Sequence, residues 1–572
     1  MNDRTSYGDS PANTQILEAT SSKFFSYDSK SELVADTSFG TAEVLSNDPL
    51  IVKYTIAPGV TWSDGVPVDA SDLLLAWAAN SGMLNTPEFD DSGYVNPETG
   101  QYSKAFPDSV VYFDGATSEG LQFVSTVPKL SKDLRSLTLT WDQYFVDWPL
   151  SLEVGLPAHV VARMALGLPI PKSTAKPDSI LRSATKAKAL LVKAVQDREI
   201  VKLSKIANSW NSGFNLDDPP KDPGVFISNG PYTVASFNAG SKLVLKANLE
   251  YHGERQPKFE TINVQFEADP LRQAQALEQG AVDVISPPFD SEVSSELSGL
   301  ANFNLLEGEA ASFEHFDFRV GGPNYATLKD PRVRKAFLMT IPRNEIRQAA
   351  LGEAASDTDL PSSIVFSADD PGYDVSINTN RSEMYLQVNI EGARSLLSQA
   401  GVSNPTVCIL YDPSSPRRQE EFKLVASSAS KAGFVVTDCS SPDWFSLLDT
   451  PGSSDASIFS WQVRNTSFSG LQSIFVTNGK SNFSGLSDPK VDEILAKMSI
   501  ATDAKQQLSL RIELDSELFD YGYGLRLFQF RHVVAFDSKV TGVALSPLSA
   551  GIFWNVEDWN LATSTSSPTP VK

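Results

Sequence analysis

Residues 390–437 constrain the fold more than any other stretch of the chain, because helical and strand patterns alternate there. A helical pattern ends at Gly401, and a strand pattern follows over residues 406–411. A second helical pattern ends at Gly433, before a second strand over residues 434–437. Strand, helix and strand at this spacing form a parallel crossover unit, since parallel strands need a long connection. We therefore predict an α/β fold.

Both cysteines of the chain fall in or beside this unit. Cys408 lies in the first strand, and Cys439 lies just past the second. Adjacent parallel strands bring such residues within reach of a disulfide, which favours an exported chain. The alternative is two unrelated thiols, at least one of them buried.

The composition is that of a globular protein of several domains. The 572 residues are 41% hydrophobic and 20% charged, with a net charge of −23. A surface this acidic argues against a nucleic-acid partner, which needs a basic footprint. No apolar run approaches the roughly 20 residues that span a bilayer. The start of the chain has no signal-peptide pattern, so we expect a cytoplasmic protein or an exported one whose signal was removed.

Local patterns predict further elements along the chain. Residues 51–56 and 131–141 alternate as strands do, and Asp69 is placed to cap a helix. A helical, locally basic stretch is expected over residues 186–207, with Lys188 solvated.

Two later helices are predicted to start in the same way. In Asp330-Pro331 and Asp488-Pro489 the Asp can accept free N–H groups, and proline suits the first turn.

The sequence offers no constellation typical of catalysis or metal binding. The four histidines are not spaced from one another or from a cysteine as transition-metal ligands are. No Gly-x-Ser-x-Gly motif surrounds a serine, and acidic pairs such as Asp90-Asp91 fall in loops or at helix starts. We expect no metal site, no cofactor and no enzyme activity, with a glycosidase as the least favoured alternative.

Four motifs occur in the order typical of one family. They are Trp62-Ser63-Asp64-Gly65 with the helix after it, Asn229-Gly230-Pro231-Tyr232 with Asn248-Leu249-Glu250-Tyr251-His252-Gly253, Asp330-Pro331-Arg332-Val333-Arg334-Lys335-Ala336, and Asn482-Phe483-Ser484-Gly485-Leu486-Ser487-Asp488-Pro489. Together they make most of the chain resemble the bacterial extracellular solute-binding proteins of family 5. That family contains oligopeptide, dipeptide and nickel receptors of ABC importers.

The resemblance implies a type II periplasmic-binding-protein-like fold of two lobes with an additional α+β domain. Lobe I would comprise residues 1–40, 212–285 and 533–572. The additional domain would comprise residues 41–211, and lobe III residues 286–532. Hinge closure of the lobes would bury a peptide or peptide-like solute.

The resemblance also suggests ligand-binding residues. Trp461 matches a cleft tryptophan of the family, but Arg464 stands where peptide receptors have an Asp that binds the ammonium group. Arg464 suits an anionic group instead. Asp9 is a candidate for the missing negative charge, and Phe313 and His315 are further candidate contacts.

The implied partners are a peptide or other small solute and the permease subunits of an ABC importer. We expect a monomer outside the cytoplasm, held at the outer face of the cell membrane by a lipid. An oligosaccharide or a nickel chelate is the alternative ligand on the same fold.

Overall fold

The computed structural model describes residues 2–562 except 116–119, 173, 216–219, 221, 290, 353–354, 357–359, 369, 464–465 and 547. The chain divides into two compact units. Unit 1 comprises Met1–Pro287, Leu300–Leu306 and Val534–Lys572, and unit 2 comprises Pro288–Gly299 and Glu307–Val533.

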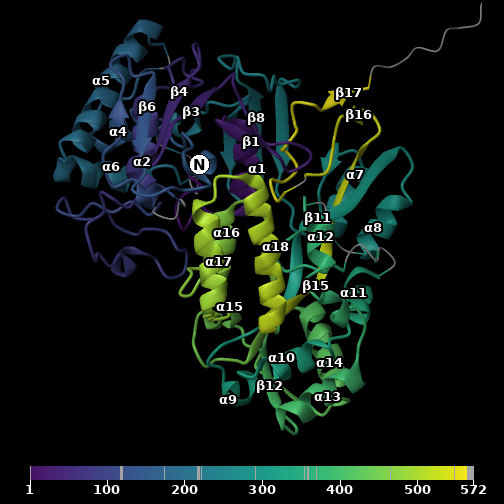
Figure 1. Ribbon diagram of the computed structural model, residues 1–572. Helices are drawn as coiled ribbons and strands as arrows, with labels where there is room; N and C mark the ends of the chain where they lie inside the picture. Colours follow the sequence, from purple (N-terminus) through teal and green to yellow (C-terminus); the bar gives the residue numbers. More distant parts are fainter. Residues whose placement is uncertain are drawn as a thin grey trace, which may run out of the picture. The chain divides into compact units, whose positions relative to one another are not determined.

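Unit 1 combines short antiparallel sheets with helices (Figure 1). Its helices are α1 (Pro11–Thr20), α2 (Ala70–Asn80), α3 (Trp148–Ser151), α4 (Ala158–Ala165), α5 (Pro177–Gln196), α6 (Ile200–Ser212) and α7 (Pro270–Glu278). Its strands are β1 (Phe25–Tyr27), β2 (Leu33–Ala35), β3 (Gly40–Asn47), β4 (Leu50–Ile56), β5 (Lys129–Leu130), β6 (Ser136–Thr140), β7 (Tyr232–Asn238), β8 (Lys242–Ala247), β9 (Thr261–Gln265), β10 (Val284–Ile285), β16 (Val540–Thr541) and β17 (Asn560–Leu561).

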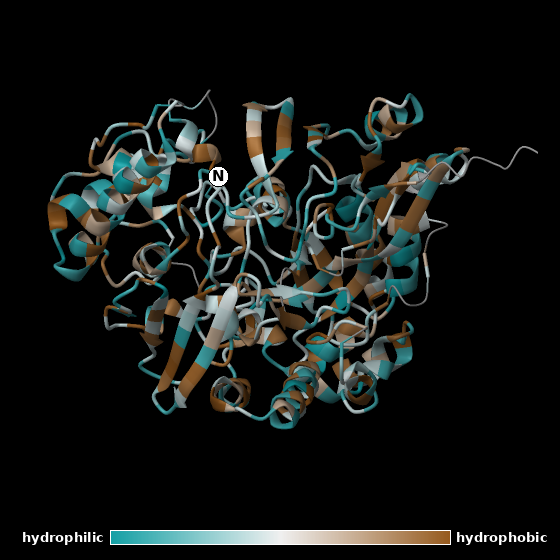
Figure 2. Cartoon of the chain, turned by 90° about the horizontal axis from the view of Figure 1, so that it is seen from above, coloured by the Kyte–Doolittle hydropathy of each residue, from teal (hydrophilic) through white to brown (hydrophobic). Residues whose placement is uncertain are grey.

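The two larger sheets of unit 1 belong to separate hydrophobic clusters. One sheet has the order β3-β4-β6-β5, and alternate side chains of β4 are buried beside α2, α4, α5 and α6 in one cluster. The sheet β7-β8-β9 packs with α1 and with residues near the end of the chain in a second cluster. Figure 2 shows hydrophobic and hydrophilic residues interspersed along helices and strands, as burial of one face of each element requires.

Unit 2 is built on long strands with helices around them (Figure 1). Its helices are α8 (Ser291–Ser298), α9 (Tyr325–Leu328), α10 (Pro331–Leu338), α11 (Arg343–Leu351), α12 (Tyr373–Ile377), α13 (Ile390–Ala400), α14 (Pro416–Ser430), α15 (Trp444–Leu447), α16 (Phe468–Phe475), α17 (Pro489–Ile500) and α18 (Ala504–Tyr521). Its strands are β12 (Thr406–Leu410), β13 (Val435–Asp438), β14 (Ala456–Gln462), and most of β11 (Phe303–Phe318) and β15 (Gly524–Asp537).

The sheet of unit 2 contains the crossover unit that the sequence predicts. Its order is β15-β11-β14-β12-β13, with β10 beyond β15. Strands β12 and β13 are parallel and joined by α14, which confirms the predicted strand–helix–strand unit. Cys408 and Cys439 form a disulfide with Cα atoms 5.7 Å apart, so the edge strand β13 is linked covalently to β12.

The predicted helix starts are confirmed. Asp69 accepts from the Ser71 amide and forms a capping box with Asp72 at the start of α2. Asp330 and Asp488 accept amide hydrogens in the first turns of α10 and α17, each with proline at the first position. Aspartates at the N-cap, two of them before proline, therefore fix these helix starts locally.

The predicted helical stretch over residues 186–207 is confirmed, but the predicted solvation of Lys188 was wrong. The stretch consists of parts of two helices, α5 and α6, interrupted near Arg198, whose φ is 51°. Lys188 is buried instead of solvated, and its Nζ lies 2.7 Å from Asp72 Oδ2 and 3.2 Å from Asp69 Oδ2. A lysine on an apolar helix face is buried here because α2 supplies two carboxylates.

Other elements differ only in length. Strand β6 is shorter than the predicted strand over residues 131–141. The division into lobe I, an additional domain and lobe III stays a prediction. In the part of the chain that the structure describes, no helix is long and apolar enough to cross a membrane.

Candidate functional site

The carboxyl end of the unit 2 sheet brings together aromatic and charged side chains. The parallel strands β12 and β14 end there, and α14 begins there. In open α/β sheets this end is where ligands bind, because loops and helix N-termini converge on it. On opposite sides of the sheet, an aromatic group and a charged group lie at this end.

The aromatic group lies on one face of β11 and β14. Phe313 is paired with Trp461 across the two strands, and His315 with Phe459. The Trp461 indole stacks on the Phe483 ring, with centroids 5.8 Å apart and planes 8° apart. The Trp461 indole is partly exposed and is supported by the rings behind it. Such a flat aromatic surface is well suited to contact with a solute.

The predicted contact residues Phe313 and His315 are buried behind Trp461. They are 8% and 3% exposed, and the His315 ring lies 6.0 Å from the indole. His315 Nε2 is 3.0 Å from Asp317 Oδ2, but their alignment is not that of a hydrogen bond. Phe313 and His315 therefore pack against the Trp461 indole and support it. Their direct contact with a solute stays a prediction.

Arg319 anchors two loops at this end of the sheet, the one after α15 and the one that contains Phe483. Its guanidinium is buried and donates to six acceptors: the carbonyls of Leu447, Leu448, Thr450 and Phe483 and the hydroxyls of Ser453 and Ser454. One side chain thereby fixes both the loop after α15 and the backbone of Phe483. Burial lowers the pKa of Arg319, although arginine stays charged at neutral pH.

The charged group lies on the opposite face. Glu314 is fully buried and opposite Ser460, whose hydroxyl donates to it at 2.6 Å. Arg417 Nη1 lies 2.8 Å and Arg418 Nε 2.9 Å from its two oxygens. Against the cost of burial, these two guanidiniums lower the pKa of Glu314.

Both arginines stand in the first turn of α14 and also contact rings. The Arg418 guanidinium lies 4.9 Å from the centroid of Trp444, and that of Arg417 lies 5.0 Å from Phe530. Ser415 caps this helix by accepting from the Arg418 amide. Cations at the helix N-terminus add to the partial positive charge of the helix, so this end of the sheet attracts anions.

Sequence reasoning missed Arg417 and Arg418 as site residues. Their position at the start of the helix that follows a strand was the available signal. Arg464 and its predicted role as an anion anchor lie outside the described residues.

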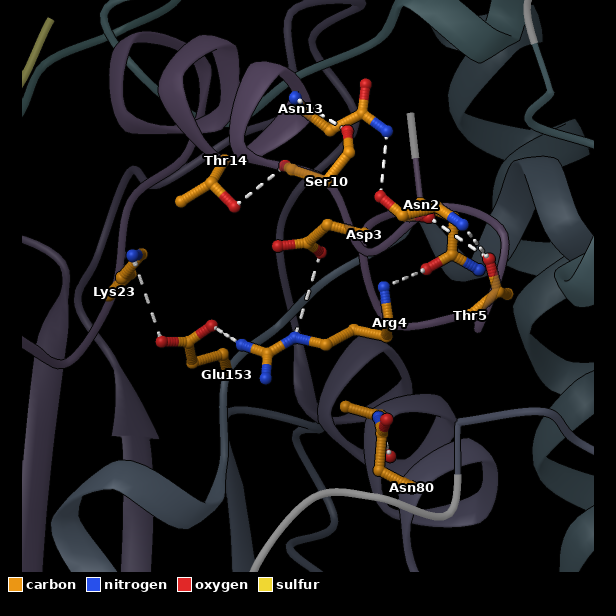
Figure 3. Close-up of polar contacts among 12 residues, drawn as sticks. Asn2, Asp3, Arg4, Thr5, Ser10, Asn13, Thr14, Lys23, Asn80 and Glu153 are labelled. Carbon is orange, nitrogen blue, oxygen red and sulfur yellow. Dashed lines mark hydrogen bonds and ion pairs between the residues drawn. The ribbon is translucent and has the colours of Figure 1, made fainter. Parts of the chain in front are cut away.

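Asp9 lies in unit 1, in the segment before α1. Its side chain is exposed and its amide donates to the Thr5 carbonyl at 2.9 Å. The neighbouring Arg4 pairs with Glu153, which also lies 3.9 Å from Lys23 (Figure 3). A role for Asp9 with a solute stays a prediction.

Two cavities among the described residues of unit 1 are too small for a solute. The cavity beside Arg4 and Glu153 measures about 20 Å³, and the one beside Glu250 and Tyr251 about 40 Å³. A single water needs roughly 10–15 Å³ on this measure, so these cavities have room for a few waters. Among the described residues no group of three His, Cys, Asp or Glu is arranged to hold a metal ion.

Comparisons with known proteins agree with the resemblance seen in the motifs. The model of a family described as "Bacterial extracellular solute-binding proteins, family 5 Middle" matches residues 160–483, more than half of the chain. An uncharacterized lipoprotein of Mycobacterium tuberculosis (strain ATCC 25618 / H37Rv) is 25% identical over 580 residues, covering 98% of this chain and 91% of that protein. The oligopeptide-binding protein OppA of the same strain is 22% identical over 545 residues, covering 93% and 78%.

A solved structure shows the same fold. The periplasmic EDTA-binding protein EppA matches with a TM-score of 0.75 at 20% identity, over 98% of this chain and 94% of that one. The two-lobe α/β fold predicted from the sequence is thereby confirmed.

Proposed function

Because the chain belongs to the bacterial extracellular solute-binding proteins of family 5, we propose that it is the receptor of an ABC importer for peptides or peptide-like solutes with a carboxylate. Closure of the two lobes would bury the solute, and the solute would leave chemically unchanged. The receptor would act as a monomer, held outside the cell membrane by a lipid and docking on the permease subunits.

The observation that carries the proposal is that an aromatic wall, Trp461 backed by Phe483, and the cation Arg417 lie at the same end of the unit 2 sheet, on its two faces. Trp461 offers a flat surface without sequence preference. Arg417, 28% exposed, offers a guanidinium suited to a carboxylate. Peptides have a terminal carboxylate, and EDTA, the ligand named for EppA, has several.

Calorimetry against a mixture of short peptides tests the function. Saturable binding, together with compaction in small-angle scattering, supports a peptide receptor. Recovery of the bound peptide intact, checked by mass spectrometry, separates a receptor from a peptidase. Absence of binding to peptides, with or without compaction, would overturn the peptide ligand.

A second ligand class rests on Trp461 alone. A partly exposed indole also stacks on sugars, so oligosaccharides are the alternative, with nickel chelates as the other family ligand. Mass spectrometry of the solute that co-purifies from native expression distinguishes the three classes.

A further inference from the structure

Two buried carboxylates share one guanidinium at the start of α14. Arg417 Nη1 lies 2.8 Å from Glu314 Oε2 and 2.5 Å from Glu421 Oε1. The two side chains are 0% and 2% exposed. Each of these buried negative charges disfavours the other, so a proton on one of the two carboxylates is favoured.

The hydrogen bonds place that proton on Glu421. Glu314 accepts from Arg417, Arg418 and Ser460, which stabilise its charge. Glu421 has one donor, at Oε1, whereas its Oε2 is buried without a hydrogen-bond partner. Burial and the Glu314 carboxylate raise the pKa of Glu421 to about 8.

The proton on Glu421 sets the net charge of the cluster of Glu314, Glu421, Arg417 and Arg418. With Glu421 neutral, two arginines face one carboxylate, and the cluster has one net positive charge beside the N-terminus of α14. With Glu421 ionised, the charges cancel and Arg417 is held between two carboxylates. A carboxylate of a solute would then compete with both for the same guanidinium.

We propose that Glu421 is a specificity-determining residue of this end of the sheet, which admits an anionic group to Arg417 when Glu421 is protonated and rejects it when Glu421 is ionised. The inference rests on the proposed function and adds to it a preference for carboxylates that weakens in alkaline solution. By linkage, binding of an anion also raises the pKa of Glu421.

The other charged groups around α14 are engaged elsewhere. Helix α11 packs against α14, and its buried Arg343 and Arg347 donate to the Pro361 and Ser356 carbonyls. Glu345 of α11 is exposed. Strand β13 also packs on α14, and its Asp438 accepts from the Tyr411 hydroxyl at 3.0 Å. The charges that act on Glu421 are Glu314, Arg417 and Arg418.

An infrared titration of the protein without solute tests the proton directly. The wild type should show the carbonyl band of a buried carboxylic acid at pH 7 that disappears near pH 8. Glu421→Gln should lack the band. Glu420→Gln is the matched control, because Glu420 is exposed and pairs with Lys423, and it should keep the band. No such band at pH 7 in the wild type overturns the inference, whether or not any solute binds.

Acetate, the smallest carboxylate, tests the link to anions. Saturating acetate should raise the midpoint of the titration by about one pH unit, which equals about a tenfold change in affinity. An unmoved midpoint overturns the inference.

Trialanine and its carboxyl-terminal amide separate this inference from the proposed function. Trialanine should bind about tenfold more weakly at about pH 9.5 than at about pH 6, whereas the amide and the Glu421→Gln variant should show no such loss. Equal loss for acid and amide overturns the inference and keeps the peptide receptor. Binding of neither peptide overturns the peptide function, while the acetate titration still decides the role of Glu421.

Discussion

The rings of Trp461 and Phe483 lie parallel, with their centroids 5.8 Å apart. The two residues come from different elements, the end of β14 and the loop before α17. Arg319 donates to the Phe483 carbonyl at 3.1 Å and so fixes the ring that supports the indole. The aromatic wall therefore depends on a hydrogen-bond network beneath it.

Replacing Trp461 by leucine should weaken solute binding by about 1–2 kcal/mol, because a flat stacking surface is lost. Calorimetry with a peptide that binds the wild type measures the loss. Phe445→Leu is the control, since Phe445 is 67% exposed and should leave the affinity unchanged. Equal affinities of the wild type and the Trp461 variant would remove the indole from the site.

Arg464→Ala should weaken an anionic solute by roughly 1.5–3 kcal/mol, the value of a hydrogen bond to a charged group. A neutral analogue of the same solute should lose little. A variant that binds the anion as tightly as the wild type would exclude Arg464 as an anchor.

Arg319→Met should lower the free energy of unfolding by about 3 kcal/mol, because it leaves several buried acceptors without a donor. Urea unfolding measures the change. Arg332→Met is the control, because the exposed Arg332 pairs with Asp330 at the surface and should contribute under about 1 kcal/mol. Similar losses in both variants would contradict the role of Arg319.

The free energy of unfolding should fall as the pH rises from about 4.3 to about 8. The pKa of Glu421 is raised in the folded state, so the folded chain holds a proton that the unfolded chain releases at lower pH. The stabilising effect is complete below the unfolded pKa of about 4.3 and is lost as the pH passes the folded pKa. Urea unfolding across this range should show a flatter profile for Glu421→Gln than for the wild type. Parallel profiles would contradict the assignment.

Removing the disulfide by Cys408→Ala with Cys439→Ala should lower the free energy of unfolding by about 3.5 kcal/mol. The bond joins residues 31 apart, and the estimate follows from the chain entropy of a loop of that length. Thermal unfolding of the variant measures the loss. A variant as stable as the oxidised wild type would show that β13 is held by its backbone alone.

Local signals in the sequence predicted much of the fold. Asp69, Asp330 and Asp488 act within one helical turn, so their caps are visible in the residues around them. The burial of Lys188 could not be predicted from the sequence, because its partner Asp72 is far away in the chain. Burial of a charge depends on such distant partners, and a helical pattern does not contain them.

The candidate site was only partly predictable for the same reason. Trp461 stood out as an aromatic residue in a family motif, and it lies at the carboxyl end of β14. The role of Glu314 depends on Arg417 and Arg418, which reach it from α14. A strand residue flanked by aromatic residues gives no sign of such a pairing, so the charged group emerged only from the structure.

The bond between Cys408 and Cys439 encloses more than an edge strand. Arg417, Arg418 and Glu421 all belong to the segment that it closes into a ring. Reduction would open that ring and remove one constraint on the position of α14. A reducing agent would thus act on the one segment of the chain that bears both arginines and the glutamate beside them.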